Sequence, residues 1–174
     1  IGAIPIFNII DYEIMREMLI NATEEQMKMY AKHDLQRMKD MDAYIGVRAS
    51  TNTAELNGIS KEKMDLYNKF YTLPVHFEER VKHTKWCILR YPNASMAQMS
   101  NMNTEAFEDF YFDICTLDYD KMSKAMNPLV DLMNKTKNVH IVGEGTDLTF
   151  SIEGIPAEKY MGTFNIPDGE VATA

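Results

Sequence analysis

Apolar positions in the first part of the chain alternate between short continuous runs and stripes of helical spacing. The run over residues 4–10 is typical of a strand that is buried on both faces of a parallel sheet. Two helical stripes follow, one behind Asp11 and one behind Thr23, which forms a capping box with Gln26. Residues 43–47 then form a second short, β-prone run, so a βαβ unit joins the two runs. The stripes consist of Ile14, Met15, Met18 and Leu19, and of Met27, Ala31, Leu35 and Met38.

The same alternation continues through the middle of the chain. Ser60 begins a further helix, with Ile59 and Met64 placed as a hydrophobic staple, and Pro74 interrupts or bends this helix. Residues 86–89 form the next apolar run and are predicted to be a third strand. Two more amphipathic helices follow. The first places Phe107, Phe110, Tyr111 and Ile114 on one face, and the second runs over residues 119–135 with Met122, Met126, Leu129, Val130 and Met133 inward. The chain is therefore predicted to be an α/β fold, a parallel sheet flanked by helices in three layers.

The pattern changes near residue 137. Apolar and other residues alternate on both sides of Gly143-Glu144-Gly145, which is typical of a β-hairpin. Because the alternation of helix and strand ends here, we expect a domain boundary. Residues 1–136 form the α/β domain, and residues 137–174 form a short β-rich tail that begins a second domain. The alternating apolar residues are Val139, Ile141, Leu148, Phe150 and Ile152.

The composition is that of an acidic globular protein. The chain has 174 residues, 45% of them hydrophobic, which suffices for one ordinary core. A formal net charge of -8 argues against nucleic acid as a partner, because phosphate binding depends on clustered Lys and Arg. No apolar run approaches the roughly 20 residues of a membrane span, and the first residues lack the order of a signal peptide. We expect a cytoplasmic protein without membrane association, in which Cys87 and Cys115 are buried thiols, with a disulfide as the less favoured alternative.

Residue types alone do not define a catalytic site. The Gly143-Glu144-Gly145 segment lacks the third glycine and the following helix of a dinucleotide-binding loop, so a tight turn is the better interpretation. His76 and His83 share a face only if their segment is helical, and no Cys or Asp completes a ligand set, which favours a solvated helix face. No serine stands in a nucleophile-elbow context, and neither cysteine lies beside a histidine. Covalent catalysis therefore has no support.

The two ends of the chain are typical of a fragment. The sequence opens without Met, directly on a strand-like run, and it stops at Ala174 with no terminating element. Processing or disorder in a longer chain would give the same appearance. We expect the chain to be part of a longer protein.

The second half of the chain resembles a known enzyme family. Five ordered blocks between residues 86 and 174 carry the resemblance. They are Trp86-Cys-Ile-Leu-Arg-Tyr-Pro, Glu105-Ala-Phe-Glu-Asp-Phe-Tyr-Phe, Asp118-Tyr119, Gly145-Thr-Asp-Leu-Thr-Phe-Ser-Ile-Glu-Gly and Asn165-Ile-Pro-Asp-Gly-Glu-Val. The chain resembles the thermophilic metallo-aminopeptidases, the family of aminopeptidases T and S. Residues 1–85 fit the amino-terminal α/β domain of that family through the order of strands and helices.

The resemblance implies one metal ligand in this chain. In that family the glutamate of the last block binds a metal, and this glutamate corresponds to Glu170. From the residues alone, Glu170 is an exposed carboxylate behind the Pro167-Asp168-Gly169 turn. Ala172 stands where members of the family commonly carry an aromatic residue, so the match around Glu170 is incomplete. The remaining ligands are expected in a carboxyl-terminal domain beyond Ala174.

The resemblance also implies a reaction, release of amino-terminal residues from peptide substrates with the help of two divalent ions, zinc, cobalt or magnesium. One ion would anchor the free amine and polarise the carbonyl, and a shared hydroxide would attack the peptide bond. Members of the family form homodimers around an internal chamber, so the α/β domain is expected to act as wall and support. The 174-residue chain alone is expected to be inactive.

A different class of function remains open. The alternative is a non-catalytic α/β module that binds a partner or a small ligand at the carboxyl ends of its strands. A nucleotide-binding enzyme is a weaker alternative, because the chain has no phosphate loop. The reading frame beyond Ala174 distinguishes the first two: a stop favours the binding module, and a domain with acidic residues and histidines favours the peptidase.

Overall fold

A computed structural model describes residues 2–173 as a mixed α/β fold with a three-stranded parallel sheet. The strands are β1 (Ala43–Arg48), β2 (Lys85–Arg90) and β6 (Asn165–Ile166), in the order β1-β2-β6. Both pairs are parallel, and Ile45 lies opposite Cys87 in the register. Antiparallel strands occupy the carboxyl-terminal end. The predicted fold class, a parallel sheet flanked by helices and followed by a β-rich tail, is confirmed.

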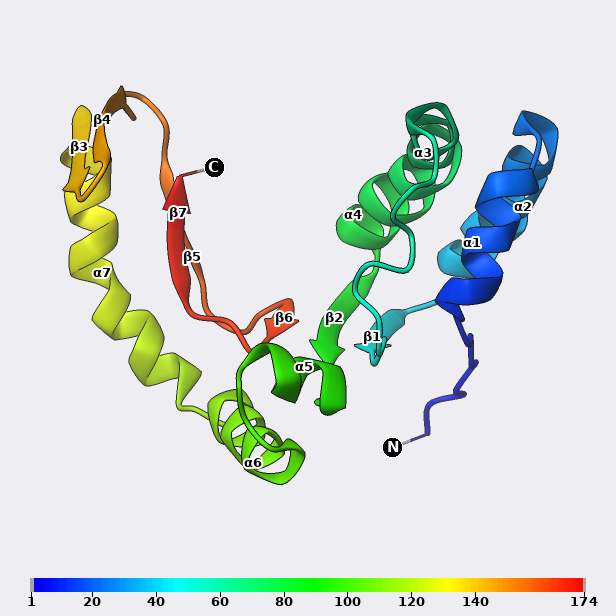
Figure 1. The fold of residues 1–174 in the computed structure, drawn as a ribbon, viewed down its shortest axis with the longest axis horizontal. Coiled ribbons are helices and arrows are strands. Elements are labelled where there is room, and N and C mark those ends of the chain that lie inside the picture. The colour runs from blue at the N-terminus through cyan, green and yellow to red at the C-terminus, as the bar shows by residue number, and fades with distance from the viewer. Residues whose placement is uncertain (1, 174) are drawn as a thin grey trace.

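The helices form two groups in space. In Figure 1, α1 to α4 lie beside β1 and β2, whereas α7 lies beside the antiparallel strands near the carboxyl terminus. Between the two groups, α5 lies near β6, and α6 packs on α5 at the lower edge of the view. The helices are α1 (Tyr12–Asn21), α2 (Glu24–Lys39), α3 (Lys61–Tyr67), α4 (Val81–His83), α5 (Ala94–Met99), α6 (Thr104–Cys115) and α7 (Tyr119–Lys135), and the π-helix η1 (Asn68–Arg80) joins α3 to α4.

Two antiparallel pairs make up the tail. Strands β3 (Asn138–Gly143) and β4 (Thr146–Ser151) form the predicted hairpin, and Gly145 has a φ of +71°, which a tight turn requires. Strands β5 (Ala157–Tyr160) and β7 (Glu170–Thr173) form a second pair. The short strand β6 lies between them in sequence but joins the parallel sheet. The boundary expected at residue 137 stays a prediction.

The predicted starts of the first two helices are confirmed. The Asp11 carboxylate accepts the backbone N–H of residues 13 and 14 at 2.9 and 3.0 Å, which caps α1. Thr23 and Gln26 exchange hydrogen bonds between side chain and backbone at 2.8 and 3.2 Å, and this capping box begins α2. Each cap satisfies N–H groups that have no partner inside their own helix.

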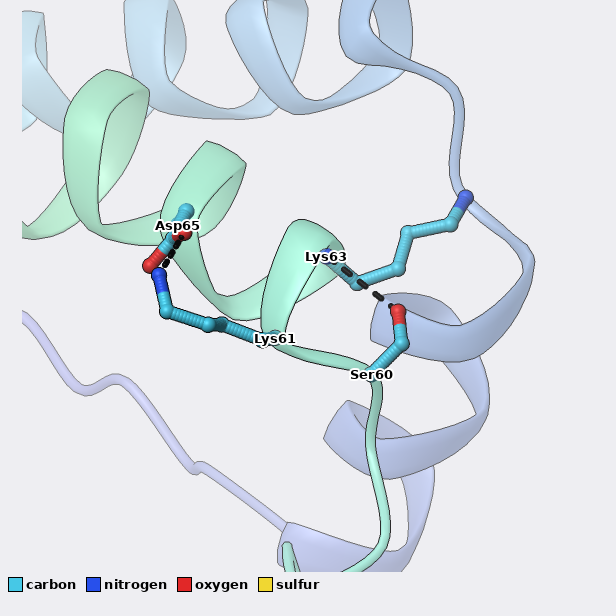
Figure 2. A network of polar contacts seen from close by, with 4 residues as sticks. All are labelled: Ser60, Lys61, Lys63 and Asp65. Carbon is cyan, nitrogen blue, oxygen red and sulfur yellow. Dashed lines mark hydrogen bonds and ion pairs between the residues drawn. The ribbon is translucent and has the colours of Figure 1, made fainter.

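The third helix begins at the predicted cap as well. Figure 2 shows the Ser60 hydroxyl, which accepts the backbone N–H of Lys63 at 3.3 Å, and the ion pair between Lys61 and Asp65 at 2.5 Å. The Lys63 ammonium donates to the carbonyl of Ala22 at 2.5 Å and so ties α3 to the turn between α1 and α2. This contact joins α3 to the first two helices, both of which also lie against it.

The strand predicted over residues 4–10 is wrong. Residues 2–10 are neither strand nor helix, and the side chain of Ile9 is 93% exposed. A run of β-branched residues becomes a strand only where a neighbouring strand supplies ladder hydrogen bonds, and no strand of the described residues pairs with this segment. The predicted βαβ unit is therefore replaced by one that runs from β1 through α3, η1 and α4 to β2.

Of the two effects predicted for Pro74, interruption of the helix is wrong, and a bend stays a prediction. The chain stays helical from Lys61 to His83, and Pro74 lies inside η1. Proline lacks the N–H of an i→i−4 hydrogen bond and its ring collides with a carbonyl of the preceding turn. The wider i→i+5 turns of a π-helix accommodate the ring, so the helix continues instead of ending.

The core consists of small clusters on the helix stripes. In the predicted stripe of α2, Met27, Ala31 and Met38 are buried and Leu35 is half-buried, and α1 contributes Leu19, which is fully buried. The predicted faces are wider than the buried ones: Ile14 on α1 and Phe110 on α6 are exposed, and α7 has no fully buried side chain. Side chains at the margin of a stripe stay in solvent because no described element covers them. The clusters are Leu19, Ala22 and Met27; Ala31, Met38, Tyr71 and Val75; and Ala97, Phe107 and Tyr111.

The two cysteines are less buried than predicted. Cys87 and Cys115 are free, as expected, but both are half-buried rather than buried. Burial raises the pKa of the Cys115 thiol, so this side chain is held in its protonated, weakly nucleophilic form.

A half-buried histidine gives the fold a pH dependence. Burial, and then the neighbouring Arg80 guanidinium, lower the pKa of His76 from 6.5 to about 4. The unfolded chain therefore binds a proton before the folded chain does as the pH falls. Stability from His76 is present above about pH 6.5 and is lost as the pH falls toward about 4.

We expect His76→Gln to reduce this acid destabilisation by about 1–2 kcal/mol, a value discounted for the partial exposure of the ring. The free energy of unfolding in urea is measured near neutral pH and at about pH 4.5 for the variant and for the parent. Because the carboxylates contribute equally to both proteins, their contribution cancels when the two losses of stability are compared. The exposed His33 of α2 provides the control, His33→Gln. If both variants lose as much stability as the parent when the pH falls, burial of His76 does not lower its pKa.

Candidate functional site

Glu170 is the first residue of β7 and faces solvent. It lies opposite Tyr160 of β5, and Glu158 lies opposite Ala172. Because residues paired across an antiparallel ladder share a face, and side chains repeat every second residue, Glu158 and Glu170 project from the same face of this two-stranded ribbon.

The opposite face of the ribbon is attached to α7. The ammonium group of Lys159 donates to the carbonyl and hydroxyl of Ser123 at 3.1 and 3.0 Å and to the side-chain oxygen of Asn127 at 2.8 Å. Near the end of α7, the Asn134 side chain accepts the backbone N–H of Ala157 at 2.9 Å. These contacts fix which face of the ribbon is free, and it is the face that carries Glu170.

The loop between β5 and β7 is attached to the parallel sheet. The backbone N–H of Ile88 in β2 donates to the carbonyl of Phe164 at 2.7 Å. The ring of Phe164 stacks on Trp86, with centroids 4.6 Å apart. Trp86 opens the first block of the resemblance, and the last block begins next to Phe164. Two blocks that lie far apart in sequence therefore meet at this contact.

The turn immediately before Glu170 is closed by Asp168. Its two carboxylate oxygens accept the backbone N–H groups of Gly162 at 2.9 Å and of Gly169 at 3.1 Å. The carboxylate of Glu170, in contrast, makes no hydrogen bond or ion pair within residues 2–173; only its backbone pairs, with Tyr160 in the ladder. Asp168 shapes the turn, and Glu170 remains available for a ligand.

Gly162 allows the segment that follows β5, which Asp168 joins to the turn before Glu170, to pack against α7. Its φ is +80°, and a Cβ atom at this position would lie 2.8 Å from the ring of Tyr119. We expect Gly162→Ala to lower the free energy of unfolding by about 1–3 kcal/mol, through backbone strain and overlap with the ring. Thermal or urea unfolding measures this loss.

Gly145→Ala is the matched control for Gly162→Ala. Gly145 also has a positive φ, +71°, but nothing lies within 4 Å of the added methyl group. Its expected loss is about 1 kcal/mol, from backbone strain alone. Equal losses for the two variants would contradict the packing of the turn on Tyr119.

The described residues fit a part of a metal site. A free, exposed carboxylate is a suitable ligand for zinc or magnesium. Within residues 2–173, however, no three His, Cys, Asp or Glu side chains lie together as a metal-binding group. Residues 2–173 therefore contain no complete metal site of their own, and the role of Glu170 as a ligand stays a prediction.

Comparison with known families decides how this arrangement is interpreted. The sequence profile described as thermophilic metalloprotease (M29) matches residues 2–174. The chain belongs to this family. The match includes all five blocks and the loosely similar amino-terminal part, so the predicted resemblance is confirmed. The description of this family is that of a metal-dependent protease.

A solved structure supports the same fold. AmpT from Thermus thermophilus superposes with a TM-score of 0.62 and 19% sequence identity, over 92% of this chain and 47% of that chain. At this identity the likeness shows the fold alone, and the M29 chain described here spans about half the length of AmpT. A search of curated proteins finds no match. Within residues 2–173, no helix has both the length and the apolar composition of a bilayer span.

The role of Glu170 predicted from the sequence stays a prediction, and sequence reasoning missed the contacts that fix the turn before it. Asp168 was considered only as a turn residue, although an Asp-Gly pair behind a proline is a signal for side-chain closure of the turn. The interpretation of His76 and His83 as one solvated helix face is wrong for His76, which is half-buried beside Arg80. His83 is exposed, as expected.

Proposed function

We propose that this chain is the amino-terminal part of a metal-dependent aminopeptidase, which releases amino-terminal residues from peptides, and that Glu170 is one of its metal ligands. The main support is the match of residues 2–174 to a metalloprotease family. The exposed, unpartnered carboxylate of Glu170 on a firmly attached turn agrees with this role.

The chain's own residues would serve to hold and orient Glu170. The divalent ion, zinc, cobalt or magnesium, would act as a Lewis acid toward the scissile carbonyl and lower the pKa of water. Lys159 attaches the ribbon to α7, and Asp168 closes the turn, so the backbone from which Glu170 projects is fixed before an ion binds. Such pre-organisation favours metal binding because less conformational freedom is lost.

Several finer points belong to the same proposal. We expect a pair of ions, with the other ligands outside this chain, since one carboxylate cannot hold two. Residues 1–136 would form a supporting α/β domain and residues 137–174 the start of the catalytic domain. We also propose that the complete protein is a cytoplasmic homodimer and that the isolated chain is inactive.

Chelation of the complete gene product tests the proposed function. Release of amino-terminal residues from short peptides is measured before and after treatment with a chelator, and again after zinc, cobalt or magnesium is returned. We expect activity to fall below about 1% and to recover with at least one of the ions. Activity that resists chelation, or no activity with any ion, would overturn the proposal and favour the non-catalytic binding module.

A further inference from the structure

A second candidate site lies at the opposite end of the chain from Glu170. A hollow of about 860 Å³ is bounded by β1, η1, α2 and the segment before α1. This volume lies within the range of small-molecule sites, about 300–1,000 Å³. Its lining includes Arg37, Tyr44, Arg48, His76 and Arg80. It contains no residue of β5 or β7, so it is separate from the proposed metal ligand.

Arg80 is the most unusual residue of this lining. Its side chain is only 8% exposed, and its Nε donates to Nδ1 of His76 at 3.3 Å. The guanidinium group lies over the rings of Trp86, at 4.4 Å, and Tyr44, at 5.4 Å. Its Nη1 is buried and has no hydrogen-bond partner within residues 2–173. Buried polar groups are nearly always paired, so a buried cation with unused donors calls for an acceptor.

The charges around Arg80 favour an anion. Arg80, Arg48 and Arg37 all act on His76 and help to lower its pKa, while Asp34 is the one carboxylate that acts on it in the opposite direction. Asp34 is already engaged, by the Arg37 guanidinium at 2.9 Å and the Tyr71 hydroxyl at 2.5 Å. Of the charged groups that act on His76, three are guanidinium groups and one is a carboxylate.

Three acidic side chains also line the hollow, namely Asp11, Glu13 and Glu55. Asp11 caps α1, and Glu55 accepts a hydrogen bond from Asn52 at 2.7 Å. None of the three is among the charged groups that shift the pKa of Arg80. They therefore do not supply the missing partner of Arg80.

We propose that this hollow binds a small molecule through an oxyanion, a carboxylate or a phosphate group, which accepts hydrogen bonds from Arg80. A guanidinium group presents its N–H donors in a planar fork that matches such an oxyanion. Arg48, exposed at the end of β1, contributes a second positive charge. The site is independent of the metal and of the proposed peptidase function.

Calorimetric titration of the complete gene product tests the site, with inorganic phosphate and with succinate as separate probes. The salt concentration is held constant with chloride, and a chelator is present so that a metal site does not contribute. We expect saturable binding of at least one probe, one molecule per chain, and the probe that binds identifies the type of oxyanion. In Arg80→Gln the affinity is expected to fall about 10-fold or more, because hydrogen bonds to a charged donor are lost.

Two further variants make the result decisive. Arg48→Gln alters an exposed side chain that folding does not need, and it is expected to weaken binding several-fold even if Arg80→Gln fails to fold. Arg16→Gln changes an arginine of α1 outside the hollow and is expected to bind like the parent. The proposal is overturned if neither probe binds saturably, or if Arg48→Gln and a folded Arg80→Gln bind as the parent does.

Discussion

Replacing Glu170 by Gln in the complete gene product is expected to lower kcat/KM for the release of amino-terminal residues by more than about 100-fold. An amide oxygen carries no net charge and is a weaker ligand for a divalent ion than a carboxylate. Loss of groups that only support a ligand commonly reduces metal affinity or activity about 10–100-fold, so loss of the ligand itself should exceed this range. Activity and bound metal are measured on the same preparation.

Glu158→Gln is the matched control for Glu170→Gln. Glu158 is an exposed carboxylate on the same face of the same ribbon, and its replacement makes the same change of charge. We expect it to retain activity and metal. Both variants should fold like the parent, since neither carboxylate has a hydrogen-bond or ion-pair partner within residues 2–173. A Glu170→Gln enzyme with full activity would contradict the assignment.

Leu19→Ala is expected to lower the free energy of unfolding by about 3 kcal/mol, within the 2–5 kcal/mol that large cavities cost. Leu19 is 0% exposed and belongs to the cluster that joins α1 to α2 and α3. Truncation removes apolar contacts and leaves a void that its neighbours fill only in part. Urea unfolding followed by circular dichroism measures the change.

The control for Leu19→Ala lies on the same helix. Ile14 is 72% exposed, and Ile14→Ala should change the free energy of unfolding by less than about 0.5 kcal/mol. Both changes create an alanine in α1, so helix propensity does not explain a difference between them. Similar losses of free energy of unfolding at the two positions would contradict the packing of α1 through the face that carries Leu19.

Local signals predicted most elements of this fold because each depends on a few neighbouring residues. Asp11, Thr23 and Ser60 mark the helix starts, and their side chains cap the helices as expected. The two failures have different causes. Residues 4–10 have the composition of a strand but lack a partner strand, and Pro74 is accommodated by a local change of helix type. The docking of β6 on β2 is a non-local contact of two residues, too short to leave a pattern in the sequence.

The candidate site was less accessible to sequence reasoning than the fold. Physical patterns described Glu170 only as a turn carboxylate, and the resemblance alone assigned it a metal. The structure adds that Asp168 closes the turn while Glu170 stays free. Arg80 gave no signal at all in the sequence, because its burial results from the packing of η1 against Tyr44 and Trp86.

The most direct test of the central claim is a crystal structure of the complete gene product with its metal bound, in which anomalous scattering locates the ions. We predict a carboxylate oxygen of Glu170 about 2.0–2.2 Å from an ion, with the other ligands supplied from outside residues 2–173. A structure that holds its ions on other residues, with Glu170 in bulk solvent, would contradict the account.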